Sequence, residues 1–322
     1  MTTTNTLKKV KTSFNVFYKT TLLHKVLYGL SLLVALFLMF NYGKSQVEGF
    51  EQKTNKFKMF TEIPDIYDDF YISLYDDLVF SKLKNDFEVT KIIKNTKPTN
   101  ESKILDIGSG KGHHVSSFVA HGFKSVGIDI SPSMVKESKK TYPELKFKLA
   151  DATNSSVFQS NEFSHITCFY FTIYYIQNKQ LLFQNAIDWL MPGGYLIIHL
   201  VNRDRFDPIL PPGNPLSTVS VQKYAKKRIT TTTINFNEFV YKSNFKLNNE
   251  VSSIDTPNAF MVESFKNNKN GNVRKHEHQL YMLTQSEILK IAKDVGFIVH
   301  SKIDLVECQY DNQYIYILQK PN

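Results

Sequence analysis

The 322-residue sequence predicts an α/β protein whose main sheet is mostly parallel and carries helices on both faces. Three observations support this prediction. An apolar run at 104–107 ends in a glycine-rich loop, strand-like and helix-like segments then alternate to residue 200, and acidic residues end two successive strands. A separate uncharged run near the N-terminus predicts one transmembrane helix before the sheet.

The first 64 residues are expected to lie outside the α/β domain. Residues 1–21 are rich in Thr and Lys and predict a disordered basic tail. Residues 26–43 are uncharged and would span roughly 27 Å as a helix, so a transmembrane helix is predicted over 22–43. A polar linker is expected at 44–64, and the domain itself at 65–322.

Two other interpretations of the uncharged run stay open, a cleaved signal peptide and a buried core helix. No small-residue cleavage site follows Phe40, which favours an uncleaved anchor. Lysines are nearly equal in number on the two sides of the run, so they leave the orientation in the membrane open.

The positive charge of the chain is concentrated at its N-terminus. Nine lysines and two glutamates in residues 1–60 account for +7 of the net charge of +9, which leaves +2 for the other 262 residues. A basic surface for a nucleic acid is therefore not expected on the folded domain. The two cysteines, Cys168 and Cys308, provide no disulfide framework.

The glycine-rich loop predicts a nucleotide-type cofactor site. Gly108, Gly110 and Gly112 follow the first apolar strand and precede a helix that is expected from Val115. Glycine allows positive φ and a close approach of a ligand to the backbone. A dinucleotide fingerprint would need a third small residue where His113 stands, so an oxidoreductase of that kind is disfavoured.

The segment Asp106-Ile-Gly-Ser-Gly-Lys-Gly112 resembles motif I of the class I S-adenosylmethionine-dependent methyltransferases. The resemblance continues through Asp129 at the end of a strand at 125–130, Asp151 at the end of a strand at 147–151, and Met191-Pro-Gly-Gly194 before a strand at 195–200. It covers about 65–202 and 284–320. The family usually has Asp near the start of its fourth strand, where this chain has Ser164.

The resemblance implies a Rossmann-like, doubly wound, seven-stranded and mostly parallel sheet, closed by an antiparallel pair of strands at 297–306 and 313–319. It implies S-adenosyl-L-methionine as the cofactor. Asp129 would accept the ribose hydroxyls and Asp151 the adenine amino group. The implied cofactor-binding residues are Asp106, Gly108, Ser109, Gly110, Gly112, Asp129, Ile130, Asp151, Ala152 and Tyr170.

Two further segments are expected to cover the site. Tyr67, Tyr71 and Tyr75 recur at a spacing of four, which predicts one helical face. That face is either a core stripe or, by the resemblance, part of a helix that folds over the methyl donor. Residues 203–283 alternate in strand-like fashion and predict an antiparallel insertion, similar to one in methyltransferases of small metabolites, including sugar N-methyltransferases.

The residues expected at the substrate end of the site come from three places. His199 is the first candidate for a general base, His276 and His278 are weaker ones, and Tyr75 and Tyr170 complete the catalytic candidates. The expected substrate contacts are Phe171, Tyr174, Arg274 and His276. The pairs His113-His114 and His276-x-His278 are typical of metal ligands, but no acidic or thiol cluster completes either pair, so no metal is expected.

These observations predict a methyltransferase for a small or lipid-soluble acceptor, anchored in a membrane with its catalytic domain in the cytosol, where the methyl donor is supplied. A methyltransferase acting on a protein and a non-catalytic interaction protein that keeps the fold are the alternatives. The identity of the acceptor and the oligomeric state are not encoded in any motif of this chain.

Overall fold

The computed structural model describes residues 56–213, 220–250 and 255–322, together with Thr21 and seven positions of a helix between Leu22 and Val34. The chain divides into two units, residues 1–54 and 55–322. The predicted tail, most of the predicted membrane helix and residues 44–55 of the predicted linker therefore lie outside the described residues. Within the described part of the chain, no helix combines the length and the apolar character needed to cross a bilayer.

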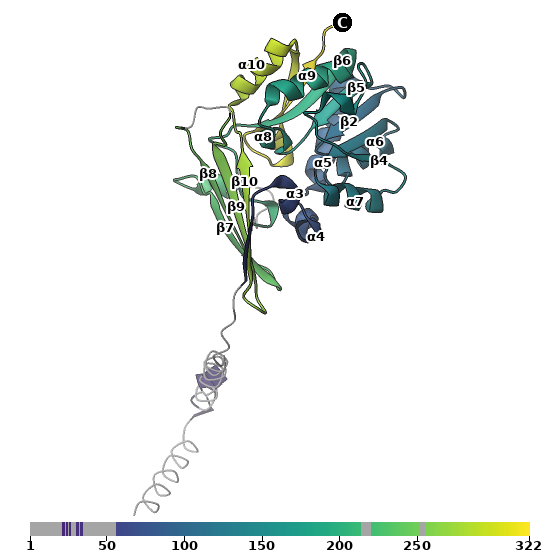
Figure 1. The fold of residues 1–322 in the computed structure, drawn as a ribbon. Helices are drawn as coiled ribbons and strands as arrows, with labels where there is room; N and C mark the ends of the chain where they lie inside the picture. Colours follow the sequence, from purple (N-terminus) through teal and green to yellow (C-terminus); the bar gives the residue numbers. More distant parts are fainter. Residues whose placement is uncertain are drawn as a thin grey trace, which may run out of the picture. The chain divides into compact units, whose positions relative to one another are not determined.

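The larger unit contains a seven-stranded mixed sheet with the strand order β11-β12-β6-β5-β2-β3-β4 (Figure 1). Strands β2 to β6 pair in parallel, whereas β12 is antiparallel to β6 and β11 is antiparallel to β12. The strands are β2 (Lys103–Ile107), β3 (Lys124–Asp129), β4 (Lys146–Leu149), β5 (Phe163–Cys168), β6 (Leu190–Val201), β11 (Ile298–Asp304) and β12 (Gln313–Gln319). The predicted Rossmann-like fold is confirmed, with the antiparallel pair at its end.

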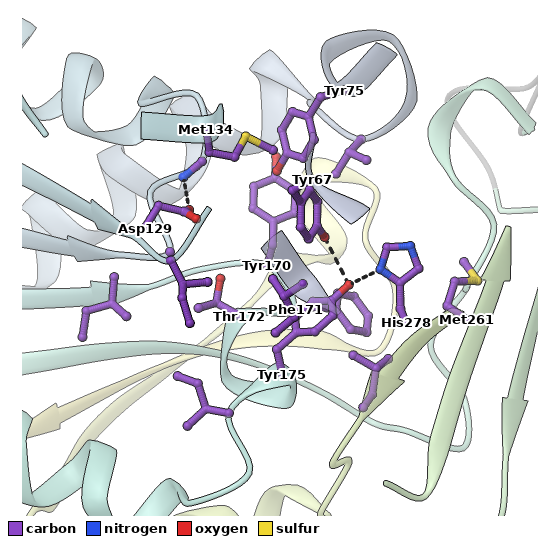
Figure 2. Close-up of a pocket in the computed structure, with 18 of the residues that line it drawn as sticks. Tyr67, Tyr75, Asp129, Met134, Tyr170, Phe171, Thr172, Tyr175, Met261 and His278 are labelled. Carbon is purple, nitrogen blue, oxygen red and sulfur yellow. Dashed lines mark hydrogen bonds between the residues drawn. The ribbon is translucent and has the colours of Figure 1, made fainter. Parts of the chain in front are cut away.

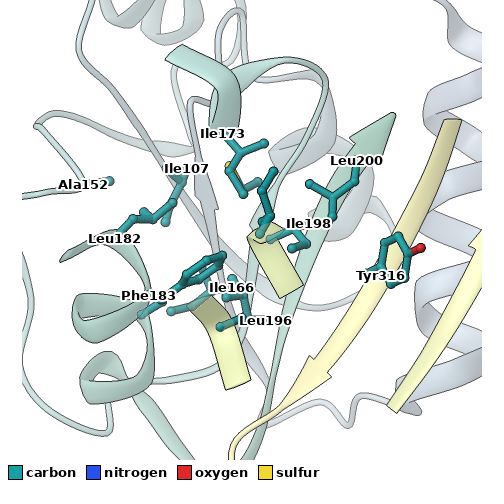
Figure 3. Packing of buried hydrophobic residues seen from close by; sticks show 14 of the residues in the cluster. Ile107, Ala152, Ile166, Ile173, Leu182, Phe183, Leu196, Ile198, Leu200 and Tyr316 are labelled. Carbon is teal, nitrogen blue, oxygen red and sulfur yellow. The ribbon is translucent and has the colours of Figure 1, made fainter. Parts of the chain in front are cut away.

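The parallel strands of this sheet are buried on both faces because helices cover each face. Ile104 of β2 joins a core cluster with α5 and α6, whereas the next residue, Leu105, joins the cluster formed with α9 and α10. Figure 3 shows the second cluster, in which Phe183 of α9 packs near Ile166 and Leu196. The helices are α5 (Lys82–Thr96), α6 (His113–Ala120), α7 (Pro132–Thr141), α8 (Thr172–Tyr175), α9 (Lys179–Trp189) and α10 (Gln285–Val295).

The ends of two helices follow from their local sequences. Ser131 caps α7 by accepting a hydrogen bond from the Met134 N–H, with Pro132 as the first helical residue. Thr284 and Glu287 form the capping box of α10, and Gly296 ends that helix with a φ of 119°. Helix α6 begins at His113, two residues before the predicted start.

A second sheet stands beside the first, with the strand order β1-β10-β9-β8-β7 (Figure 1). Strands β7 (Thr231–Asn235), β8 (Phe239–Leu247), β9 (Ala259–Asn267) and β10 (Val273–Leu280) form the predicted antiparallel insertion. The fifth strand, β1 (Phe57–Phe60), comes from the segment predicted as a linker and pairs in parallel with β10. The linker prediction is therefore wrong for residues 57–60, because β1 satisfies backbone groups that β10 would otherwise leave unpaired at a sheet edge.

Helices α3 (Ile63–Ile66) and α4 (Asp69–Leu78) connect β1 to the main domain and lie between the small sheet and α7 (Figure 1). Asp68 separates them and caps α4 by accepting hydrogen bonds from the N–H groups of Phe70 and Tyr71. This connection brings the predicted tyrosine stripe to the carboxyl ends of the parallel strands. Four short 3₁₀ helices complete the described elements: η1 (Ser155–Val157), η2 (Pro211–Gly213), η3 (Val221–Tyr224) and η4 (Leu305–Cys308).

Candidate active site

A cavity of about 390 Å³ lies where the carboxyl ends of β2, β3 and β5 meet α4 and the small sheet. One side of it is made by the glycine loop and the ends of β3 and β4. The other side is made by tyrosines and by residues of β8 to β10. Because open α/β sheets bind ligands at the carboxyl ends of their strands, this cavity is the candidate site.

The glycine loop is shaped to let a ligand approach its backbone. Gly108 has a φ of 69°, and a Cβ at that position would lie 2.5 Å from the side chain of Thr172. Gly110 has a φ of 53°, and among the described residues only the Tyr75 hydroxyl, at 3.8 Å, lies within 4 Å of a Cβ placed there, so this face opens into the cavity. Neither position accepts a larger residue without strain.

Asp129 links the end of β3 to the glycine loop. Its Oδ2 accepts a hydrogen bond from the Gly110 N–H at 2.9 Å, and its Oδ1 accepts one from the Ser131 N–H at 2.9 Å. Burial raises the pKa of this carboxyl, and the backbone donors partly offset that rise. The carboxylate lies on the cavity wall, as Figure 2 shows.

The end of β4 forms the rim beyond Asp129. Asp151 lines the cavity there, and its Oδ1 accepts hydrogen bonds from both the N–H and the hydroxyl of Thr153 at 2.8 Å. Both interpretations of Asp151, a turn cap and a ligand residue, are thus compatible with its position. The predicted cofactor residues that line the cavity are Gly108, Gly110, Asp129, Ile130, Asp151, Ala152 and Tyr170.

Three predicted cofactor residues do not line the cavity. Asp106 is buried behind the loop, where its Oδ1 accepts a hydrogen bond from the Thr167 hydroxyl at 2.7 Å and burial raises its pKa to about 6. Position 112 requires glycine because a Cβ there would lie 2.5 Å from the ring of Phe147. Ser109 is buried against Gly127. Their role is to build the loop, and contact with a ligand is not supported.

A buried charged cluster supports the site from behind. Lys84 and Glu88 of α5 form a fully buried ion pair, and Glu88 also contacts Nε2 of His114 at 2.9 Å. The Lys84 ammonium lies 3.9 Å from the centre of the Tyr170 ring, a cation–π contact. Tyr170 has a φ of 50°, an uncommon conformation for a residue other than glycine, and it lines the cavity.

The opposite wall of the cavity is aromatic. Tyr71 and Tyr75 lie on α4, and Tyr67 lies between α3 and α4, with its ring centre 5.2 Å from that of Tyr71. Tyr170 and Tyr175 face them from the end of β5 and from α8 (Figure 2). Electron-rich ring faces and hydroxyls at this density suit a cationic or polar ligand.

A continuous chain of hydrogen bonds runs from this wall into the small sheet. The Tyr67 and Tyr175 hydroxyls are 3.1 Å apart, and the Tyr175 hydroxyl is 2.7 Å from Nδ1 of His278 (Figure 2). Nε2 of His278 is 2.8 Å from Oε2 of Glu263. All four side chains line the cavity.

Glu263 is the last residue in this series of hydrogen bonds, and it is almost fully buried. Its Oε1 accepts hydrogen bonds from the hydroxyls of Tyr241 at 2.7 Å and Tyr71 at 3.2 Å. Burial by itself would raise the pKa of Glu263, but the nearby His276 ring and the hydrogen bonds from His278 and Tyr241 hold it well below its ordinary value. Glu263 is therefore a carboxylate.

The structure does not bring the first candidate base, His199, to the cavity wall. His199 is buried on β6, where its Nδ1 donates to the Tyr170 carbonyl at 2.6 Å. Burial lowers its pKa to about 3. This prediction is wrong in placement, because β6 turns the side chain into the core behind Tyr170 and away from the strand ends.

Three of the four predicted substrate contacts also lie away from the cavity. Tyr174 is buried and its hydroxyl accepts the Val201 N–H at 2.8 Å. Arg274 pairs with Asp68 at 2.9 Å, and His276 accepts a hydrogen bond from Arg274 behind Glu263 and Tyr71. Phe171 does line the cavity, together with the catalytic candidates Tyr75 and Tyr170.

Glu263 supplies the acidic partner that the sequence pattern lacked for His276 and His278. The three side chains offer ligand atoms within 4.8 Å of one another, as a metal site would. The Arg274 Nε–H donates to Nε2 of His276, however, which leaves the proton of the neutral ring on Nδ1, the atom that faces Glu263. The contacts in this part of the described structure therefore favour a hydrogen-bonded network over a metal centre.

Glu263 was missed because a single acid in a strand carries no motif. A signal was available in the alternation of β9, where Ala259, Met261, Glu263 and Phe265 share one face. A carboxylate on an otherwise apolar face indicates a buried polar network or a ligand site.

Comparison with known proteins agrees with this geometry. Residues 104–194 match the family described as "Methyltransferase domain". Protein 235L of Invertebrate iridescent virus 6, named as a methyltransferase, is 30% identical over 125 residues, which are 38% of this chain and 43% of that protein. The chain thus spans less than half the length of this curated relative.

Solved structures share the fold at low sequence identity. An S-adenosylmethionine-dependent methyltransferase from Clostridium acetobutylicum superposes with a TM-score of 0.58 at 16% identity, over 79% of this chain and 99% of that one. CalS10 of Micromonospora echinaspora, solved with S-adenosylmethionine and described as an amino pentose methyltransferase, has a TM-score of 0.52 at 15% identity, over 74% and 90%. Residues 104–194 are therefore similar in sequence to a methyltransferase domain, and the chain shares its fold with S-adenosylmethionine-dependent methyltransferases of known structure.

Proposed function

We propose that the protein transfers the methyl group of S-adenosylmethionine to a small-molecule acceptor that binds against the tyrosine wall of the cavity. The observation that carries this proposal is that one cavity contains both halves of such a site. Gly108, Gly110 and Asp129 line one side, and Tyr67, Tyr75 and other tyrosines line the other.

The residues on the first side fit the cofactor. The open backbone at Gly110 suits the amino acid part, the Asp129 carboxylate suits the two ribose hydroxyls, and the apolar rim at Ile130 and Met134 suits the adenine ring. When bound, the cofactor supplies an electrophilic methyl group on a sulfonium. The protein's part is to hold the acceptor in line with that methyl group and to exclude water.

A small-molecule acceptor is favoured over a protein side chain. The cavity lies between the two sheets, where the tyrosine wall on α4 and α8 meets side chains of strands β9 and β10. CalS10 is described as acting on an amino pentose, an acceptor of this size, and it supports the proposal by analogy of fold alone.

The test incubates the full-length protein with methyl-labelled S-adenosylmethionine and a small-molecule extract of the cells that make it. We expect label in the small-molecule fraction and S-adenosylhomocysteine as the second product. Label only on proteins would favour the protein acceptor. No transfer to either fraction, despite measurable binding of S-adenosylhomocysteine by calorimetry, would favour the non-catalytic alternative.

We further propose that residues 22–43 attach the protein to a membrane and leave the catalytic domain in the cytosol. The support is the uncharged run of 18 residues, in which Val26, Leu30 and Leu33 expose more than half of their surface. Fractionation of cells that express the full chain should place it in the membrane pellet, resistant to high salt. A chain that is fully recovered in the supernatant, or that carries a glycan at the acceptor sequence Asn154-Ser-Ser156, contradicts this placement.

A further inference from the structure

The acceptor side of the cavity carries negative charge with no side-chain cation opposite it. Glu263 lines this side, and among the described residues that line the cavity none is Lys or Arg. A buried carboxylate whose partners are histidines and hydroxyls, and not a permanent cation, suits a site that receives a positively charged ligand.

Among the described residues, the groups that contact Glu263 are hydroxyls and imidazoles, and none is the side chain of Lys or Arg. Tyr71 from α4 and Tyr241 from β8 donate neutral hydroxyl hydrogens. His276 from β10 has its pKa lowered by burial, and its Nδ1 lies 3.5 Å from the carboxylate. Arg274, a permanent cation on the same strand as His276, is already paired with Asp68.

The charge of Glu263 determines which atom donates in each hydrogen bond that connects Tyr67, Tyr175, His278 and Glu263. A carboxylate accepts only, so Nε2 of His278 carries the hydrogen of the neutral ring. Nδ1 of His278 then accepts from the Tyr175 hydroxyl. The Tyr175 oxygen accepts in turn from the Tyr67 hydroxyl and keeps one lone pair, which is free to face the cavity.

We propose that the methyl acceptor is an amine that enters as its ammonium form, and that Tyr175, backed by His278 and Glu263, takes its proton before methyl transfer. This inference rests on the proposed function. Tyr175 is the catalytic residue because it lies on the cavity wall. His278 and Glu263 act through it as positioning residues. The same order of hydroxyl, histidine and carboxylate activates nucleophilic hydroxyl groups in other enzymes.

The step balances without a further reactant. The ammonium proton moves to the Tyr175 oxygen while the Tyr175 hydrogen moves to Nδ1 of His278, which becomes an imidazolium beside the Glu263 carboxylate. The freed nitrogen lone pair then forms the bond to the methyl carbon, and the electron pair of the broken carbon–sulfur bond stays on sulfur. The tyrosines hold the incoming and outgoing ammonium by cation–π contacts.

The first experiment identifies the labelled products of the extract reaction by mass spectrometry. Methyl label on nitrogen is the expected result. Label confined to oxygen, sulfur or carbon overturns this inference and leaves the proposed methyltransferase function standing. No labelled small molecule at all overturns the proposed function, and this inference with it.

The second experiment uses the unmethylated amine from which the labelled product was formed as substrate for Tyr175→Phe and His278→Gln. We expect kcat/KM near neutral pH to fall by about 10²–10⁴ in both variants, the usual contribution of a proton acceptor. Tyr316→Phe is the matched control, since it removes a hydroxyl that bonds Gln285 away from the cavity, and it should keep full activity. Equal activity in Tyr175→Phe and the control overturns the proposal.

The pH dependence separates a proton relay from a structural role. Without His278, only amine that is already neutral in solution reacts, so kcat/KM of His278→Gln should rise about tenfold per pH unit and approach the wild type near pH 10, the range in which aliphatic amines titrate. A loss that is the same at every pH would mean that His278 only holds the wall, and it would overturn the relay.

A spectroscopic measurement gives a readout besides turnover. In nitrogen NMR of the histidine-labelled full chain, His278 should change from the neutral Nε2–H form to an imidazolium when the unmethylated acceptor amine binds together with S-adenosylhomocysteine. A ring that stays neutral contradicts the relay. If Zn²⁺ removes this change in the His278 signal, or if EDTA abolishes activity, Glu263, His276 and His278 would be assigned to a metal site. Either result would also overturn the relay.

Discussion

Replacement of Asp129 by Ala is expected to raise the dissociation constant of S-adenosylhomocysteine by about 10²–10⁴. The proposed contact is a pair of charge-assisted hydrogen bonds to the ribose hydroxyls, each worth roughly 1.5–3 kcal/mol. The carboxylate is placed for this by the N–H groups of Gly110 and Ser131, which hold it at the cavity wall. Isothermal titration calorimetry of the full-length chain measures the change.

Asp304→Ala is the matched control for this experiment. Asp304 also stands at the end of a strand and also accepts the N–H of the residue two positions on, Val306, at 3.0 Å, but it does not line the cavity. Both variants lose a backbone cap, and only Asp129→Ala should lose cofactor affinity. Unchanged affinity in Asp129→Ala, or equal losses in both variants, would remove Asp129 from the cofactor site.

Replacement of Glu88 by Gln is expected to destabilise the domain by about 3–5 kcal/mol. The change leaves the Lys84 ammonium buried without its counter-charge, which is the costly outcome when one partner of a buried ion pair is removed. The loss should also loosen Tyr170, whose ring the ammonium contacts. Urea denaturation of the two proteins measures the difference.

The same helix contains the control for this prediction. Lys82 and Asp86 form an ion pair at the same spacing of four residues, but their side chains are 79% and 52% exposed. Asp86→Asn should therefore cost less than about 1 kcal/mol. A similar cost for the two variants would mean that the Lys84–Glu88 pair contributes no more than a surface pair.

The stability from Glu88 should also depend on pH. Burial by itself would raise its pKa, but Lys84 and His114 lower it from 4.5 to about 2. Because the folded-state pKa is depressed, the contribution is complete above pH 4.5 and is lost as the pH falls toward 2. In Glu88→Gln this part of the pH dependence should be absent.

The cofactor half of the site was predictable because it is local. A glycine loop after one strand and an acidic residue at the end of the next are visible directly along the chain, and parallel pairing brings those strand ends to one edge. Gly108, Gly110, Asp129 and Asp151 therefore reach the cavity as predicted. Asp106 and Gly112 belong to the same motif, but they build the loop, and a motif does not distinguish the two roles.

The acceptor half was not predictable because it depends on contacts between distant segments. The Tyr67–Tyr175 contact joins residues 108 positions apart, and the Tyr175–His278 contact joins residues 103 positions apart. Each residue type is ordinary in its own segment. The failure at His199 has the same origin. A residue near a strand end can point to either face, and only the packing of β6 against Tyr170 decides that its side chain turns inward.

By itself, the sequence determined the α/β class, the order of strands and helices, and the cofactor loop, because hydrophobic period, glycine positions and capping residues act over a few neighbouring residues. Only the tertiary structure decided that β1 joins the insertion, that α4 closes over the strand ends, and that Glu263 lines the cavity as a buried carboxylate. Those outcomes depend on which surfaces meet, and side chains that face one another across two sheets leave no periodic trace in the chain.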